Sequence, residues 1–400
     1  MTIAVSPATD AVQRTIDGPR HAYPVAGFAE ARFMPVVDAF CEHFRVGSEL
    51  GASVCVTIGG DVVVDLWGGF ADLQHTRPWT RDTLCNVMSV SKGFTAACLH
   101  ALVDRGLVDL DAPVARYWPE FAANGKDRLP VRWLTDQRAG LPVLEEDLWP
   151  GAIFDWEAMT SALARQAPIV EPGRVAAYHI RTSGFLIGEL VRRVAGVGLD
   201  EFLRREIAEP FDIDFHFGLD DGEIARTAEF EAAREGTLLD TSTYDRDSLI
   251  ARAGRQMSSP MDYNGDQYRR SVIPSSNGHG NARSVARLYA ILANGGELSG
   301  RRLLSRRAID TAREEQHRQT EIVLNRTYRQ GLGFLLNTPG DFPIGPAPGS
   351  FGMHGMGGAL GMCDPEAKMS FGYVESKMHT VSGLGPRAKN LLRATYETIG

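Results

Sequence analysis

The stretch CNVMSVSKGFTAACLHALVDRG, residues 85–106, decides how the rest of this sequence is interpreted. Its apolar spacing predicts a helix over 90–106, and Ser89-Val90-Ser91-Lys92 stands where that helix starts. Residues three apart face the same side of a helix, so the Lys92 amine can reach the Ser89 hydroxyl. The helix N-terminus and partial burial disfavour an added positive charge, and a neutral lysine can deprotonate a serine that attacks a carbonyl. The alternative is a helix-capping serine beside a solvated lysine.

The composition makes the lysine at position 92 informative. The chain has 400 residues with 42 Lys and Arg against 50 Asp and Glu, a net charge of −8, which argues against a nucleic-acid partner. Only five of those 42 cationic residues are lysines. Arginine keeps its proton, so only an amine at position 92 can serve as a base.

The cysteines and the N-terminus bear on the compartment. The five cysteines are odd in number, widely spaced and never arranged as CxxC, so we expect buried thiols, no disulfide framework and no zinc site. The N-terminus lacks a signal-peptide pattern and the chain lacks an apolar run of membrane-spanning length. We therefore expect a cytoplasmic protein that has no membrane partner.

Both ends of the chain predict paired strands beside a helix. The segments in chain order are a helix over 28–46, strands over 52–58 and 61–70 joined by Gly59-Gly60, an apolar pair over 358–365 and 366–374, and a helix over 385–399. The middle has helical periodicity, clearest over 90–106, 182–195, 199–207 and 282–295. This order predicts an α/β (α+β) fold, with one antiparallel sheet assembled from both chain ends, flanked by helices.

The same pattern predicts the domain organisation. We expect a loose N-terminal tail over 1–22, an α/β domain formed by 23–110 together with 285–400, and a mainly helical subdomain over 111–284. An active site is expected where the domain and subdomain meet.

Two further elements accompany Ser89 and Lys92. A Pro-Gly turn leads to Tyr178 just before the helix over 182–195, and a tyrosine hydroxyl near an amine can relay a proton to a leaving group. His354-Gly355-Met356 runs into a glycine-rich stretch, where glycines let a strand edge approach a substrate and leave a backbone N–H free for an oxyanion. Taken singly, the tyrosine could be packing and the glycines an ordinary turn.

The order S-x-x-K, Tyr, then a short basic-Gly-x motif before a terminal hairpin resembles the serine β-lactamase and penicillin-binding-protein superfamily. Within it, the sequence looks most like the class C β-lactamase-related esterases called family VIII carboxylesterases. The resemblance covers about residues 28 to 398 and includes the stretches 102–121, 134–142 and 278–297. It implies a β-lactamase/transpeptidase-like fold. The nucleophile elbow G-x-S-x-G of the α/β-hydrolases does not occur.

The resemblance implies a role for each matching residue. Ser89 looks like the acyl-forming nucleophile, Lys92 its general base, and Tyr178 the group that moves protons to and from the leaving group. The backbone N–H groups of Ser89 and Met356 would form the oxyanion hole. His354 and Gly355 stand at the substrate, where β-lactamases and transpeptidases have the K-T-G motif.

Three departures from the superfamily pattern bear on the substrate. His354 replaces the K-T-G lysine, and a histidine of ordinary pKa is largely neutral at pH 7, so it attracts an anionic β-lactam less strongly. Ile180 stands where β-lactamases have the asparagine of Tyr-x-Asn, which removes an amide that would bind the acyl group. Asp136-Gln137 stands where relatives usually have Ser-His, a change that points only to local hydrogen bonding.

These expectations describe a serine hydrolase that cleaves short-chain, largely uncharged carboxylic esters and needs no cofactor or metal. Its partner is a small-molecule ester, possible alternatives being an amide or a β-lactam. Acyl transfer, amidase activity and weak β-lactamase activity would use the same residues. The alternative from another class is a non-catalytic protein that keeps the fold for binding or as a scaffold. The oligomeric state and physiological substrate are not determined by the sequence.

A histidine and two tryptophans allow both a functional and a structural interpretation. His279, in GHGNAR, could lie near the pocket, although a structural role is the default. Trp149 or Trp156, in EEDLWPGAIFDWEAM, could line an apolar acyl or alcohol pocket, with core packing as the default.

Overall fold

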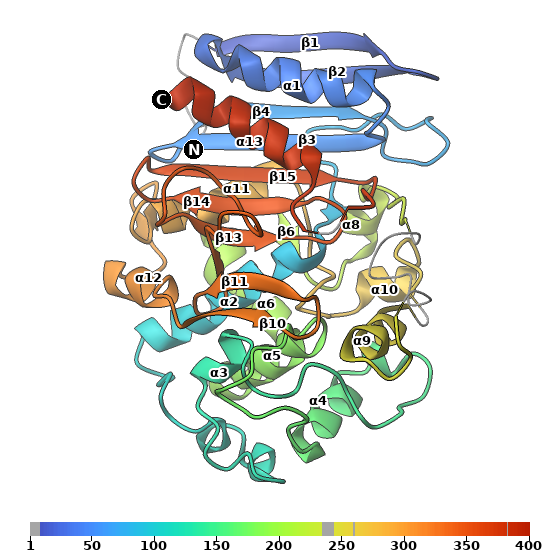
Figure 1. Cartoon of the computed structure of the whole chain (residues 1–400). Coiled ribbons are helices and arrows are strands. Elements are labelled where there is room, and N and C mark those ends of the chain that lie inside the picture. The colour runs from blue at the N-terminus through green and yellow to red at the C-terminus, as the bar shows by residue number, and fades with distance from the viewer. Residues whose placement is uncertain (1–8, 234–243, 259–260, 382) are drawn as a thin grey trace.

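The largest element of the fold is an antiparallel sheet. The structure is a computed structural model that describes residues 9–233, 244–258, 261–381 and 383–400. Among these residues, ten strands form one sheet, which runs in Figure 1 from β1 at the top to β10. In sheet order they are β1 (Thr9–Asp17), β2 (Ala22–Glu30), β4 (Asp61–Gly69), β3 (Gly51–Ile58), β15 (Met369–Glu375), β14 (Leu360–Asp364), β13 (Phe351–His354), β12 (Leu335–Leu336), β11 (Arg326–Gln330) and β10 (His317–Glu321).

The two ends of the chain meet in the middle of this sheet. β3 pairs with β15, and Val54 lies opposite Tyr373 in the register. β3 is buried along almost its whole length, as expected for a central strand covered on both faces. The prediction of one antiparallel sheet assembled from both chain ends is confirmed.

The glycine pair between β3 and β4 forms the predicted tight turn. Gly59 has φ +63° and Gly60 has φ +97°, and a primed hairpin turn requires positive φ at both central residues. The second predicted hairpin is β14 with β15, and residues 365–368 connect the two strands. Both hairpins and the closing helix, α13 (Pro386–Ile399), are therefore confirmed.

Two predictions near the N-terminus are wrong. The predicted tail over 1–22 contains β1, which pairs with β2 and buries Val12 and Ile16; residues 1–8 lie outside the described part. The composition hides this strand because an edge strand keeps many polar side chains in solvent. The predicted helix over 28–46 begins only at Met34, because residues 28–30 end β2, where they pair with β1 and, over 28–29, with β4.

Helices cover both faces of the sheet. α1 (Met34–Arg45) and α13 contact each other and lie in front of the N-terminal strands in Figure 1. α11 (Ala282–Ala293) packs against β15 and β14. A Cβ at Gly372 of β15 would lie 2.2 Å from the Ala282 carbonyl oxygen of α11, so this close approach requires a glycine.

The rest of the described chain is mainly helical. Its helices are α2 (Ser91–Asp104), α3 (Arg132–Thr135), α4 (Trp156–Arg165), α5 (Thr182–Ala195), α6 (Leu199–Leu203), α7 (Glu209–Phe211), α8 (Asp221–Ala225), α9 (Leu249–Ser258), α10 (Asp266–Arg270) and α12 (Arg306–Ala312). A π-helical turn, Arg204–Ala208, joins α6 to α7, so the helix predicted over 199–207 is present with a wider turn. Short strands pair in two small sheets, formed by β5 (Cys85–Asn86), β7 (His279–Gly280) and β6 (Phe215–His216), and by β8 (Glu297–Leu298) and β9 (Arg301–Arg302). The boundaries at 110 and 285 stay a proposal; α11 crosses the second of them.

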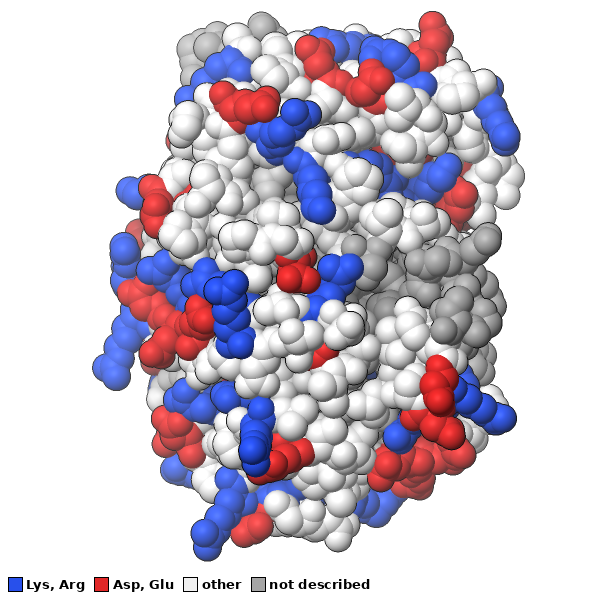
Figure 2. All heavy atoms as spheres, in the orientation of Figure 1, with Lys and Arg blue, Asp and Glu red and all other residues white. Residues whose placement is uncertain are grey.

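The charged side chains on the surface and the cysteines are arranged as the composition predicts. Figure 2 shows basic and acidic side chains interspersed on the face drawn. All five cysteines are free and buried, as predicted. Within the described ranges, every helix is too short or too polar to cross a bilayer.

Candidate active site

Ser89 lies at the end of a tight turn that leads into α2. β5 is held beside β7, and Val87 N–H donates to the Gly278 carbonyl at 3.0 Å. Met88 has φ +47°, a conformation that non-glycine residues rarely adopt, and its N–H donates to Asn86 Oδ1 at 3.0 Å. A 3-10 turn over Met88–Val90 then continues as α2. Ser89 is partly exposed while its neighbours in the turn, Met88 and Val90, are buried.

The Lys92 amine has three neighbours with distinct hydrogen-bonding roles. Its Nζ lies 3.3 Å from Ser89 Oγ, 2.9 Å from the Ile180 carbonyl and 3.0 Å from the Ser275 carbonyl. A carbonyl only accepts hydrogen bonds, whereas the serine hydroxyl also donates. A neutral amine has two N–H bonds and one lone pair. When the two carbonyls take the N–H bonds, the lone pair faces the Ser89 hydroxyl.

Three consecutive backbone N–H groups, those of residues 177–179, donate hydrogen bonds that hold the segment containing Tyr178. The Ala177 N–H donates to the Gln137 carbonyl at 3.0 Å, and the His179 N–H donates to Gln137 Oε1 at 2.7 Å. Between them, the Tyr178 N–H donates to Glu321 Oε2 at 2.8 Å. Gln137 and Glu321 therefore hold the backbone on both sides of Tyr178 and at Tyr178 itself. The Tyr178 ring lies beside the Lys92 amine, whose Nζ is 5.0 Å from the ring centroid.

The fold lowers the pKa of Lys92 and raises the pKa of Tyr178. Burial, reinforced by the nearby Arg181 cation, holds the pKa of Lys92 well below its ordinary value. Burial raises the pKa of Tyr178 to about 12, and a hydrogen bond with Ser89 opposes that rise. A lowered pKa favours the neutral amine, which can accept a proton from serine, whereas a raised pKa keeps the tyrosine hydroxyl protonated at neutral pH.

Two of the three departures from the superfamily pattern acquire a structural account. The Ile180 side chain replaces an amide, but the backbone carbonyl of the same residue holds Lys92. Asp136 is buried and ion-paired with Arg138, while Gln137 provides the two acceptors described above. Gln137 therefore positions the segment that contains Tyr178, while Asp136 pairs with Arg138.

His354 ends β13, and the turn that follows, with Gly355 and Met356, connects β13 to β14 and packs against the turn that carries Ser89. A Cβ at Gly355 would lie 2.5 Å from the Val87 carbonyl oxygen and 3.1 Å from the Met88 Cβ. Only a glycine permits this approach. The structure thus brings the third sequence element to the first one.

His354 carries no fixed charge. Burial, together with the Arg326 cation, lowers the pKa of His354 to about 4, so its ring is neutral at pH 7. Its Nδ1 is buried, with no hydrogen-bond partner within the described part of the chain. The Phe342 ring lies 5.4 Å away between centroids.

A buried cluster of ionisable side chains, formed by Glu49, Glu375 and Arg387, lies behind this turn and was missed by sequence reasoning. Arg387 Nη2 donates to the Gly357 carbonyl at 3.1 Å, and Nη1 donates to Glu49 Oε2 at 2.6 Å. A Cβ at Gly358 would lie 3.1 Å from a Glu375 carboxyl oxygen, so that side chain is in contact with the same turn. Arg387 is in the first turn of α13, so the C-terminal helix supports the candidate oxyanion turn.

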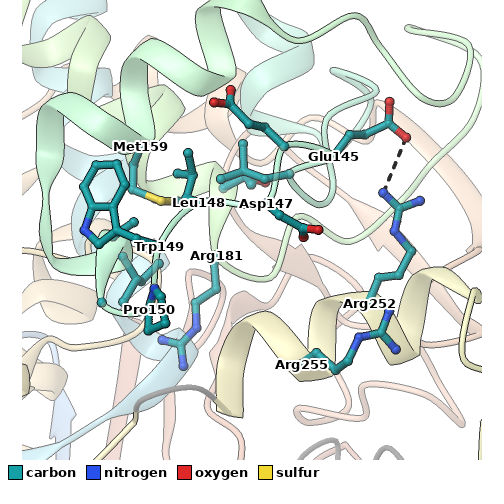
Figure 3. A pocket seen from close by; sticks show the side chains of 15 residues that line it. Glu145, Asp147, Leu148, Trp149, Pro150, Met159, Arg181, Arg252 and Arg255 are labelled. Atoms are coloured by element: carbon teal, nitrogen blue, oxygen red, sulfur yellow. Dashed lines mark hydrogen bonds and ion pairs between the residues drawn. The ribbon is translucent and has the colours of Figure 1, made fainter.

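The other candidates have structural or separate roles. His279 is buried in β7 opposite Asn86, and burial lowers its pKa to about 3, which is typical of a neutral core histidine. Trp156 Nε1 donates to Glu189 Oε2 at 2.8 Å, and its ring packs against Phe185. Trp149 is exposed and lines a cavity beside the loop over 144–153 (Figure 3). Across the described residues, no three His, Cys, Asp or Glu side chains are arranged to bind a metal ion.

Comparison with known proteins shows the family to which the chain belongs. The chain matches the beta-lactamase family over residues 37–395. It is 36% identical over 378 residues to the esterase/beta-lactamase LipL of Mycobacterium tuberculosis, which covers 90% of this chain and 85% of that protein.

Solved structures show the same architecture. The crystal structure of a family VIII carboxylesterase has a TM-score of 0.86 at 35% identity and covers 94% of this chain and 99% of the other. A penicillin-binding protein homologue from Caulobacter crescentus has a TM-score of 0.85 at 35% identity, with the same coverage. The fold is therefore that of the β-lactamases and transpeptidases. The chain belongs to the beta-lactamase family, and the resemblance inferred from motif order is confirmed.

Proposed function

We propose that this protein is a serine hydrolase that cleaves carboxylic esters through an acyl-enzyme on Ser89. The contacts of Lys92 carry the proposal. Its Nζ lies 3.3 Å from Ser89 Oγ while two backbone carbonyls occupy its other hydrogen-bonding positions. A protein that kept this fold only for binding would have no need of a buried amine aimed at a serine.

The reaction follows from these positions. Lys92 takes the hydroxyl proton as Ser89 Oγ forms a bond to the ester carbonyl carbon. The backbone N–H groups of Ser89 and Met356 would stabilise the resulting oxyanion. The alcohol leaves with a proton supplied through Tyr178, which is then replenished from Lys92. Water attacks the acyl-enzyme by the same proton transfers in reverse and releases the acid.

The substrate proposal rests on His354. A neutral ring where the superfamily has a lysine offers no fixed charge to a carboxylate, and the Arg326 cation and burial both keep it neutral. Uncharged esters are therefore favoured over anionic β-lactams. The names of the relatives, an esterase/beta-lactamase and a carboxylesterase, support this proposal.

A labelling experiment tests the assignment. A fluorophosphonate probe should label wild-type protein at one serine, and p-nitrophenyl acetate should be hydrolysed. Ser89→Ala should lose both. Ser91→Ala is the matched control, because Ser91 lies two residues away and donates to the Met88 carbonyl instead. Labelling that persists in Ser89→Ala would show that the nucleophile lies elsewhere.

A further inference from the structure

The carboxyl group of Glu321 joins two segments that are far apart in the sequence. Glu321 is buried and ends β10, an edge strand of the ten-stranded sheet. Its Oε2 accepts from the Tyr178 N–H at 2.8 Å and from the Val323 N–H at 2.9 Å, while its Oε1 accepts from the Leu324 N–H at 2.7 Å. One side chain therefore holds both the turn after β10 and the residue whose hydroxyl is the proposed proton donor.

Two more hydrogen bonds connect β10 to the segment before Tyr178. The Ala176 N–H donates to Gln319 Oε1 at 3.2 Å, and the Ile322 N–H donates to the Ala176 carbonyl at 3.1 Å. Residues 176–178 therefore lie beside the end of β10. The position of Tyr178 depends on this strand as well as on Gln137.

A second acid in the chain caps its turn in the same way with a shorter side chain. Asp364 ends β14, and its Oδ1 accepts from the Glu366 N–H at 2.9 Å and from the Ala367 N–H at 3.1 Å. These donors lie two and three residues after the acid, which is the same spacing as in the turn after Glu321. An aspartate is therefore long enough to cap such a turn. The additional methylene group of Glu321 allows its carboxyl to contact Tyr178 as well.

Hydrogen bonding at Glu321 favours its ionised form. Burial raises the pKa of Glu321. Four backbone N–H groups donate to its carboxyl and oppose that rise; they belong to Tyr178, Val323, Leu324 and Arg326. A protonated carboxyl would direct its O–H at one of these donors. Burial raises the pKa of Tyr178 to about 12, and the negative charge of Glu321 adds to that rise, so the tyrosine hydroxyl keeps its proton at neutral pH.

We propose that Glu321 is a positioning residue that holds Tyr178 where its hydroxyl protonates a departing alcohol, and that this contact suits the site to esters of aliphatic alcohols. The inference rests on the proposed esterase activity and narrows its substrate class. As the bond from the carbonyl carbon to the alcohol oxygen breaks, the electron pair stays on that oxygen and the Tyr178 proton moves to it. An aliphatic alkoxide leaves poorly without this proton, whereas p-nitrophenolate is a stable anion and leaves without it.

The test compares two acetates that differ only in the alcohol. Ethyl acetate is followed by acid release in a pH-stat and p-nitrophenyl acetate by absorbance. Both esters form the same acyl-enzyme, so kcat/KM compares their acylation steps. A substitution that only loosens the fold lowers both values alike, whereas misplacement of Tyr178 lowers the value for ethyl acetate more.

Glu321→Asp separates the two contacts of the carboxyl. The shorter side chain can still cap the turn, as Asp364 does, but no longer reaches the Tyr178 N–H. The thermal unfolding midpoint should stay close to that of wild type. The ratio of kcat/KM for ethyl acetate to that for p-nitrophenyl acetate should fall about tenfold. Glu321→Gln keeps the length and one acceptor oxygen, so its ratio should fall less.

The matched control is Asp364→Glu, which makes the reverse change in the hairpin of β14 and β15 and should leave the ratio unchanged. Tyr178→Phe removes the proton donor and should lower the ratio at least as far as Glu321→Asp. An unchanged ratio in Glu321→Asp, or an equal fall in Asp364→Glu, would overturn the role of Glu321. Should Glu321→Asp not fold, an unchanged ratio in Glu321→Gln would overturn it. Failure of the esterase proposal has a different signature, because wild-type protein would then neither react with a fluorophosphonate nor hydrolyse either acetate.

Discussion

Gln137 holds the backbone on both sides of Tyr178, with its main-chain carbonyl accepting from Ala177 and its side-chain Oε1 accepting from His179. Gln137 itself has φ +67°, so its own backbone is in a sparsely populated conformation. Gln137 thereby positions the backbone of Tyr178, whose hydroxyl is the proposed proton donor.

Loss of the Gln137 side-chain acceptor should affect turnover more than binding. Gln137→Met keeps the length of the side chain but leaves the His179 N–H unpaired, so Tyr178 is held less firmly. We expect kcat to fall about tenfold with KM within twofold, measured with p-nitrophenyl acetate. Gln330→Met is the control, since Gln330 is also a buried glutamine but donates to Gly331 and Phe334 in another strand connection. An equal fall of kcat in both variants would contradict this role.

The charge of Arg181 should set the acid limb of the pH profile. In the proposed mechanism Lys92 acts as a neutral base, so kcat/KM should rise with pH through the pKa of Lys92. Arg181 is one of the two causes that lower that pKa. Arg181→Gln removes the cation, which raises the pKa of Lys92 and moves the acid limb to higher pH. Arg181→Lys keeps the charge and should move it less; an acid limb that stays in place in Arg181→Gln would exclude this electrostatic role.

A cation at position 354 should change substrate preference. His354→Lys restores a charge where the histidine ring is neutral, so an anionic substrate gains an attraction that a neutral ester does not. We expect the ratio of kcat/KM for nitrocefin to that for p-nitrophenyl acetate to rise about tenfold, and to fall again at high salt. His354→Gln, which is uncharged, should leave the ratio near the wild-type value. A similar rise in both variants would show that charge is not the cause.

Arg387 should position the candidate oxyanion turn. Arg387 binds four acceptors, which are Ser48 O, Glu49 Oε2, Gly357 O and Lys377 O. A lysine in its place keeps the charge, but its single nitrogen cannot reach all of these acceptors. We expect Arg387→Lys to lower kcat about tenfold and to weaken inhibition by a boronic acid, whose serine adduct places an oxygen at the oxyanion position.

The control for Arg387 comes from the same buried cluster. Tyr373 donates to Glu49, whereas Arg387 donates to the Gly357 carbonyl of the turn, so Tyr373→Phe should lower thermal stability while kcat and boronic acid affinity stay near wild type. If both variants lose activity only in proportion to stability, Arg387 is structural and does not position the turn.

The local signals in the sequence predicted much of this fold. The Gly59-Gly60 pair and the alternating apolar runs predicted the first hairpin, because turn geometry and strand periodicity involve neighbouring residues only. The strand β1 escaped detection because its outer face is polar. Motif order predicted that Ser89, Lys92 and Tyr178 belong to one site.

The supporting residues were not predictable in the same way. Gln137 lies 42 residues from His179, and Glu321 lies 143 residues from Tyr178. Gln137 lies in the stretch 134–142, where the sequence pointed only to local hydrogen bonding, and Glu321 lies in none of the motifs. Hydrogen bonds between distant segments leave no periodic signal. Arg387 was not predictable either, because the chain is rich in arginine and no local pattern distinguishes this one.

The sequence by itself determined which chemical groups are available: a serine and an amine one helical turn apart, a tyrosine, and a histidine in place of a lysine. Only the tertiary structure decided their protonation states. The Lys92 pKa falls because packing removes water from the amine and brings Arg181 near, and the Ile180 and Ser275 carbonyls orient its lone pair toward Ser89. Solvation and charge proximity arise from segments that meet only in the folded chain.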